Sequence, residues 1–80
     1  MLLIEFNELN LKAKGEKTFL EGKFISSRSY YNQRLVLYSL YDFFVEVWYE
    51  PGSNKIHKIE GLNPDDKRID RYIESETKRH

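Results

Sequence analysis

The sequence predicts an α+β fold: a four-stranded antiparallel β-meander with one helix before it and one helix after it. Every second residue of the segment 43–50 is a Phe, Val or Tyr, which is the two-residue period of a β-strand. Turn-forming residues follow at 51–54, and helix start signals stand near both ends of the chain, at Asn10 and Asn63. We therefore expect the element order αββββα in a single domain of residues 1–80.

The first helix is predicted over residues 11–21. Asn10 is a suitable N-cap because its side-chain oxygen can accept a hydrogen bond from a free backbone N–H of the first turn. Gly22 is suited to the left-handed position that ends many helices. The segment 1–9 is open to two interpretations, an edge strand or a packed arm. One narrow apolar stripe follows the helix period, with a glycine that we expect to approach the sheet closely: Leu11, Gly15, Phe19 and Leu20.

Four strands are predicted between the helices. The strongest turn signal in the chain is Pro51-Gly52-Ser53-Asn54, and it separates the last two strands. Weaker two-residue turns at 32–33 and 41–42 separate the others. The predicted strands cover residues 23–31, 34–41, 43–50 and 55–60.

The turn at 41–42 sets a register for the second and third strands. It pairs Leu40 with Phe43, and a slip by one residue would place Glu46 in the core, so the pattern itself disfavours the alternative. The predicted core face of these two strands consists of Val36, Tyr38, Leu40, Phe43, Val45, Val47 and Tyr49.

The last helix has the clearest start signals. Asn63 is the predicted N-cap and Pro64 the predicted first helical residue, where a missing backbone N–H costs nothing. Ile69, Tyr72 and Ile73 share one face and should dock on the sheet. Residues 77–80 are expected to fray.

Composition excludes several classes of protein. Thirteen basic and thirteen acidic residues balance, so no field attracts nucleic acid or an anionic membrane. The absence of cysteine excludes disulfide scaffolds and Cys-ligated zinc, and fits a reducing cytoplasm. No apolar run is long enough for a signal peptide or a membrane span. We therefore expect a cytoplasmic protein that does not enter membranes.

One pattern resembles a known group of proteins. The string from Leu37 to Tyr49, LYSLYDFFVEVWY, is followed by Asn54-Lys55-Ile56 and by Ile59-Glu60. Together with the segment 19–25, Arg28 and the closing helix, it resembles a group of short uncharacterised bacterial proteins over nearly the whole chain. The resemblance consists of packing residues. It supports the predicted fold and implies no activity, substrate or partner.

No residue pattern predicts a metal, cofactor or catalytic site. The two histidines, His57 and His80, have no cysteine and no second histidine at ligand spacing. One arrangement could still carry acid–base chemistry, because a simple hairpin register places His57 opposite Trp48 and one strand repeat from Glu46. An enzyme using Glu46 and His57 is therefore the third of three hypotheses for the function.

Single-stranded nucleic-acid binding is the second reading. Sheets that bind single strands stack bases on exposed aromatic rings beside basic residues, and this chain is rich in aromatic residues. Glu46 and Glu50 interrupt the face of Trp48, and the net charge is zero, so both features weigh against it. Apart from Trp48, the candidate residues are Arg28, Tyr30, Tyr31, Arg34, Lys55 and Lys58.

The first reading is a small non-catalytic interaction module. By the predicted register the second face of the sheet is too apolar to be left to water. Either the helices divide between the two faces, or both cover one face and a partner covers the other. We favour the latter, with a homodimer as the expected assembly and an unknown protein partner as the alternative. The predicted interface residues are Leu35, Leu37, Phe44, Trp48 and Ile59.

Overall fold

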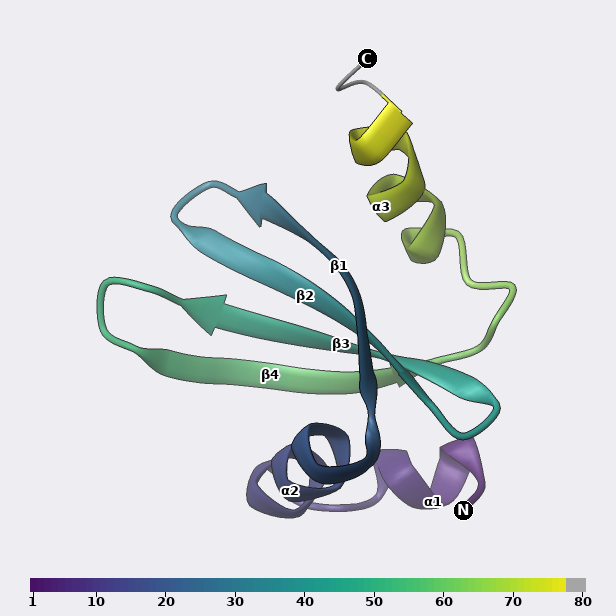
Figure 1. Ribbon diagram of the computed structural model, residues 1–80. Coiled ribbons are helices and arrows are strands. Elements are labelled where there is room, and N and C mark those ends of the chain that lie inside the picture. The colour runs from purple at the N-terminus through teal and green to yellow at the C-terminus, as the bar shows by residue number, and fades with distance from the viewer. Residues whose placement is uncertain (78–80) are drawn as a thin grey trace.

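The predicted meander is present and carries helices at both ends (Figure 1). The computed structural model describes the backbone of residues 1–77 and the side chains of residues 1–73. The strands pair in sequence order, β1-β2-β3-β4, and every pairing is antiparallel. The elements are α1 (Leu3–Asn7), α2 (Leu11–Glu21), β1 (Lys23–Tyr30), β2 (Gln33–Leu40), β3 (Phe43–Glu50), β4 (Lys55–Leu62) and α3 (Arg68–Thr77).

The segment 1–9, which the sequence left open, contains the short helix α1. Phe6 of this helix is completely buried on one sheet face, and its ring centroid lies 5.6 Å from that of Phe43, with the two rings tilted by 52°. Helix α1 approaches β4 closely at Gly61, where a Cβ atom would come within 2.5 Å of the Leu3 side chain. Asn7 fixes this contact, because its side chain accepts a hydrogen bond from the Gly61 N–H (2.7 Å) and donates one to the Gly61 carbonyl (3.2 Å).

The register of β2 and β3 is the predicted one, with Leu40 opposite Phe43. The turn between β1 and β2 differs from the prediction by one residue, because Tyr31 adopts a positive φ of 56° and the turn is Tyr31-Asn32. A register shift between Trp48 and Tyr49 also changes the last hairpin. Trp48 consequently faces Lys58 and not His57.

The helices divide between the two faces of the sheet, so the fold has three layers (Figure 1). The expectation that both helices cover one face is wrong for this reason. On the face of α1 and α2, the core consists of Phe6, Leu40, Phe43, Val45, Val47 and Ile59. On the face of α3, it consists of Leu35, Leu37, Leu62, Ile69 and Tyr72.

The predicted bounds of α2 are confirmed, whereas the predicted start of α3 and the predicted conformation of Gly22 are wrong. Helix α3 begins at Arg68 and not at Pro64, and the Asp66 carboxylate accepts the hydrogen bond from the Arg68 backbone N–H at 2.9 Å. Gly22 has a φ of −81°, so it ends α2 without a left-handed turn. Its role is spatial, since a Cβ atom there would lie 2.5 Å from the Thr18 carbonyl oxygen. Of the tail expected to fray, Thr77 belongs to α3 and residues 78–80 lie outside the described residues.

Candidate interaction surfaces

Helix α2 exposes most of its apolar stripe. Leu11 and Phe19 are about half exposed, at 45% and 49%, and Leu20 is 83% exposed. The stripe cannot reach the centre of the core because α1 holds that position with Phe6. The residues of α2 that are buried are Gly15 and Thr18.

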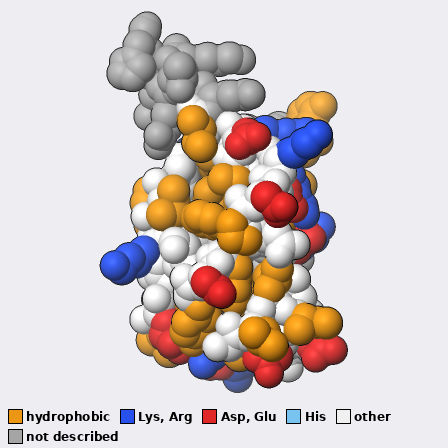
Figure 2. All heavy atoms as spheres, turned by 90° about the vertical axis from the view of Figure 1, so that its right-hand side faces the viewer, with side chains coloured by type: hydrophobic (Ala, Val, Ile, Leu, Met, Phe, Trp, Pro, Cys, Tyr) orange, Lys and Arg blue, Asp and Glu red, His pale blue; other side chains and the backbone are white. Residues whose placement is uncertain are grey.

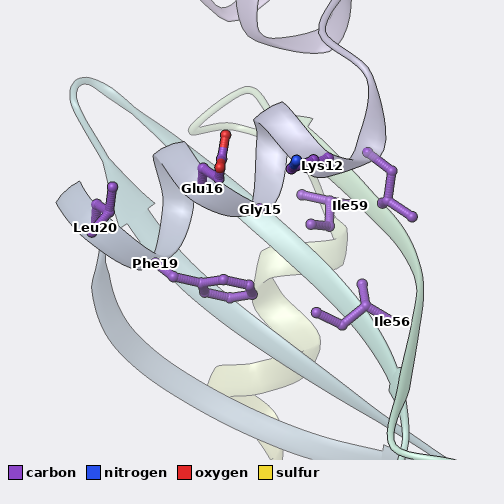
Figure 3. A pocket seen from close by; sticks show the side chains of 8 residues that line it. Lys12, Gly15, Glu16, Phe19, Leu20, Ile56 and Ile59 are labelled. Atoms are coloured by element: carbon purple, nitrogen blue, oxygen red, sulfur yellow. The ribbon is translucent and has the colours of Figure 1, made fainter.

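An open groove of about 670 Å³ runs between α2 and β4 (Figure 3). Gly15 lies at the inner wall of the groove and is buried. A Cβ atom added at this position would lie 3.5 Å from the Ile59 side chain, so the helix lies close to β4 here. In Figure 3 Ile59 lies beside Gly15, and the Phe19 ring points toward Ile56. We call this surface the α2 groove; its lining residues are Leu11, Lys12, Gly15, Glu16, Phe19, Leu20, Ile56 and Ile59.

One pair of oppositely charged residues borders the α2 groove. Lys12 and Glu16 line it, and within the described residues neither forms an ion pair. Lys17 and Glu21, one turn further along, are bonded to each other at 3.2 Å. The hydrogen bond from Tyr41, with that from Lys17, holds the pKa of Glu21 below its usual value.

The predicted interface residues do not form one surface. Leu35 and Leu37 are each 1% exposed and pack beneath α3. Phe44 and Trp48 are partly buried against the same cluster. Ile59 lies on the opposite face of the sheet, where it contributes to the α2 groove.

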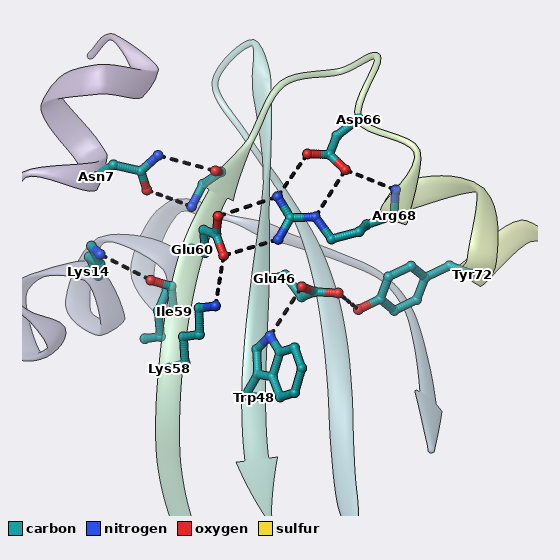
Figure 4. A network of polar contacts seen from close by, with 11 residues as sticks. Asn7, Lys14, Glu46, Trp48, Lys58, Ile59, Glu60, Asp66, Arg68 and Tyr72 are labelled. Atoms are coloured by element: carbon teal, nitrogen blue, oxygen red, sulfur yellow. Dashed lines mark hydrogen bonds and ion pairs between the residues drawn. The ribbon is translucent and has the colours of Figure 1, made fainter. Parts of the chain in front are cut away.

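A buried carboxyl group lies beneath α3 (Figure 4). Glu46 is 1% exposed and accepts hydrogen bonds from the Tyr72 hydroxyl (2.8 Å) and the Trp48 indole N–H (3.1 Å). Burial, reinforced by the bond to Glu46, raises the pKa of Tyr72 well above its usual range. The arrangement ties α3 to β3.

Arg68 holds the start of α3 with a second set of polar contacts (Figure 4). Its guanidinium donates to both Glu60 oxygens, at 3.1 and 3.3 Å, and to Asp66 at 2.9 Å. These bonds lower the pKa of Asp66. Burial pushes the pKa of Glu60 upward, but hydrogen bonds from Arg68 and Lys58 outweigh it, so that pKa is also lowered.

The acid–base pair considered from the sequence is not assembled. The His57 ring nitrogen lies 3.2 Å from Glu50, and the Glu46 oxygens are bonded to Tyr72 and Trp48. The bulge at Trp48 is the cause, because it moves His57 out of the expected register. Across the described part of the chain, no three His, Asp or Glu side chains gather to hold a metal ion.

Part of the predicted nucleic-acid set is brought together. The rings of Tyr30 and Tyr31 lie 4.7 Å apart, and those of Tyr30 and Trp48 lie 5.8 Å apart. Arg28 lies over Tyr30 at 5.8 Å, and Lys58 lies over Trp48 at 5.5 Å. We call these five residues the aromatic cluster.

The other two residues of the predicted nucleic-acid set, Arg34 and Lys55, lie outside the aromatic cluster and have other partners. Arg34 bonds the Ser27 hydroxyl at 3.0 Å, and Lys55 pairs with Glu50 in the β3–β4 ladder. Lys58 is also bound to Glu60 at 3.1 Å, which reduces the positive charge available to a phosphate.

Exposed hydrophobic side chains extend beyond the α2 groove. In Figure 2 they form a band from the level of α1 and α2 at the bottom to α3 at the top, with carboxylates set into it. Single apolar side chains among charges are normal on a protein surface. The α2 groove differs because it gathers Leu11, Phe19 and Leu20 along one concave surface. No helix within residues 1–77 is long and apolar enough to cross a membrane.

Comparison with known proteins adds no family. No family model, curated protein or solved structure matches the chain. The resemblance to short bacterial proteins therefore stays a prediction, and no substrate or partner follows from likeness to another protein.

The sequence contained one signal for the α2 groove that the sequence-based interpretation did not use. Consecutive residues of a helix point about 100° apart, so Phe19 and Leu20 cannot both face the same narrow core contact. One of the two had to project from the molecule. The position of α1, which decides how far α2 is displaced, had no comparable signal.

Proposed function

We propose that this protein is a small non-catalytic interaction module that self-associates through the α2 groove. The observation that supports this most directly is the exposure of Leu11, Phe19 and Leu20 along one apolar groove. Large exposed apolar side chains that border a concave surface favour burial by a partner. The proposal keeps the homodimer expected from the sequence and moves its interface to the opposite face of the sheet.

A second copy fits the α2 groove because the same surface offers both a projection and a recess. Leu20 projects from the helix with 83% of its side chain exposed. The α2 groove itself, with a volume of about 670 Å³, is the recess. A two-fold dimer requires one patch to complement itself, and this patch can do so by placing Leu20 of each copy in the recess of the other.

Solution mass, measured by size exclusion with light scattering over a range of concentrations, tests the proposal. We expect a concentration-dependent mass that rises toward twice 9.7 kDa. Leu20→Glu should hold the mass at the monomer value while circular dichroism stays unchanged. Ile4→Glu is the matched control, because Ile4 is 67% exposed and lies outside the α2 groove. A wild-type protein that remains monomeric at millimolar concentration would refute self-association.

The aromatic cluster favours a second candidate function, the binding of single-stranded nucleic acid. Tyr31 is 89% exposed and offers a ring on which a base can stack. A labelled oligonucleotide titrated at low salt would bind the wild type and lose most of its affinity with Tyr31→Ala, since stacking contributes about 1–3 kcal/mol per base. No change in anisotropy at tens of micromolar protein would exclude it.

The cytoplasm is the proposed location. Its support is the absence of cysteine, which suits a reducing compartment. Retention of the tagged protein in the cytoplasmic fraction would agree with this, and its recovery from a periplasmic or extracellular fraction would contradict it.

A further inference from the structure

We propose that two copies dock with their α2 helices antiparallel across a two-fold axis, so that Lys12 of each copy pairs with Glu16 of the other. This inference rests on the proposed function, because it specifies the arrangement of the same α2 groove. It adds a direction for the helices and a pair of charged contacts that self-association alone does not require.

The charged side chains of Lys12 and Glu16 lie at the positions that such a contact requires. Lys12 and Glu16 are both exposed and lie one helical turn apart on the lining of the α2 groove. Neither forms an ion pair with any described residue of its own chain. Lys17 and Glu21, with the same spacing, do bind each other. The pair at the α2 groove is thus available to a partner, and the pair beyond it is not.

Symmetry decides the direction of the helices. In an antiparallel two-fold contact the earlier residue of one helix meets the later residue of the other, so Lys12 meets Glu16 twice. A parallel contact would place Lys12 beside Lys12 and Glu16 beside Glu16, which repels. Antiparallel helix dipoles also attract when they lie side by side. Charge complementarity therefore favours the antiparallel copy over a parallel one.

A contact between Leu20 of one copy and Leu11 of the other is compatible with pairing of Lys12 and Glu16. When Leu20 of one helix lies opposite Leu11 of the antiparallel copy, Lys12 lies opposite residue 19 of that copy. Lys12 is then displaced by three residues from Glu16. Three residues correspond to about 4.5 Å along a helix axis, which the flexible side chains of lysine and glutamate can span. Leu20 of one copy can thus contact Leu11 of the other while the charges pair at the border of the α2 groove.

A charge swap tests the arrangement. Lys12→Glu puts like charges at both symmetric contacts, and so does Glu16→Lys, so each single variant should raise the dimer dissociation constant by roughly tenfold or more. An equimolar mixture of the two variants should recover a dimer, because each contact then joins a lysine to a glutamate. The double variant Lys12→Glu/Glu16→Lys should dimerise like the wild type. Lys67→Glu, an exposed site in the loop before α3, is the control for the change in net charge.

The outcomes separate this inference from the proposed function. If the wild type dimerises and Leu20→Glu abolishes it, but the single charge variants dimerise normally, the antiparallel pairing is wrong and self-association stands. If the single variants weaken the dimer and the mixture does not recover, Lys12 and Glu16 do not face each other. If the wild type is monomeric at all concentrations, both proposals fail.

Discussion

The two faces of the sheet hold their helices by different means. Beneath α1 and α2 the centre of the contact is one completely buried ring, Phe6, and the hydrogen bonds lie at the edge of the sheet, where Asn7 binds the backbone of Gly61. Beneath α3 an apolar cluster surrounds a buried carboxyl group, Glu46, that is bonded to Tyr72 of the helix. Apolar packing fixes how deep a helix lies, whereas hydrogen bonds to a buried group also fix its orientation. The orientation of α3 should therefore depend on a buried group, and that of α1 on the bonds of Asn7 to the backbone of β4.

Truncation of the central ring on the first face should have the largest effect. Phe6→Ala leaves a cavity beneath α1 and should lower the free energy of unfolding by about 3–5 kcal/mol, measured by urea denaturation. Ile4→Ala, on the same helix but 67% exposed, should change it by less than about 0.5 kcal/mol. Equal effects of the two substitutions would show that α1 does not anchor this face.

On the second face, Tyr72→Phe removes one donor from the buried Glu46. We expect a loss of about 1–3 kcal/mol in the free energy of unfolding at neutral pH, because a buried acceptor loses a partner. Tyr31→Phe, on a side chain that is 89% exposed, is the control and should be neutral. A neutral Tyr72→Phe would mean that apolar packing alone holds α3.

The raised pKa of Tyr72 extends this prediction to alkaline pH. Below the ordinary tyrosine pKa of about 10, the phenol is protonated in both the folded and the unfolded chain. Above it the unfolded chain loses the proton first, so the stabilising contribution of Tyr72 is lost as the pH rises toward the folded-state pKa. The stability difference between the wild type and Tyr72→Phe should therefore shrink above about pH 10.

The contacts of Arg68 should contribute less, because they are partly exposed. Arg68→Leu should cost about 0.5–1 kcal/mol at pH 7, and Lys67→Leu should cost less. The pKa values of Asp66 and Glu60 are lowered in the folded protein, so their contribution is present above about pH 4 and is lost as the pH falls through the folded-state values. The melting temperature of the wild type should exceed that of Arg68→Leu at pH 7 but not at pH 2.5.

An effect of similar size and opposite sign is expected at Thr18. Thr18 is completely buried, and its hydroxyl has no hydrogen-bond partner within the described residues. Thr18→Val keeps the shape and removes the unpaired group, so it should raise the free energy of unfolding by about 0.5–1 kcal/mol. Thr18→Ser keeps the hydroxyl and loses a methyl group, and it should destabilise the protein.

The sequence predicts the strands better than it predicts how the helices pack. The register of β2 and β3 follows from a local two-residue turn and from the need to keep Glu46 away from the larger core, and it is confirmed. The side on which α3 packs depends on the path of the loop 63–67 and on the bond between Tyr72 and Glu46, which no local pattern encodes. The bulge at Trp48 is likewise invisible to a period-two pattern, and it displaces His57.

The candidate surfaces were likewise predicted better where they depend on local sequence than where they depend on how the helices pack. Three members of the nucleic-acid set, Arg28, Tyr30 and Tyr31, lie within one four-residue segment, and the structure keeps them together with Trp48. The predicted interface depended on an assumption about which face the helices cover. Leu35 and Leu37 are buried by α3, and the exposed apolar surface lies on α2 instead.

The bond between Asn7 and Gly61 has a consequence for the order of folding. Each hairpin of the meander joins neighbouring segments, whereas this contact closes a loop across a sequence separation of 54. Loop closure of that length carries an entropic cost that local hairpins avoid, and contacts of large separation slow folding. The meander can thus assemble before α1 docks, and the strength of the Asn7 contact would then govern how fast the native chain opens more than how fast it forms.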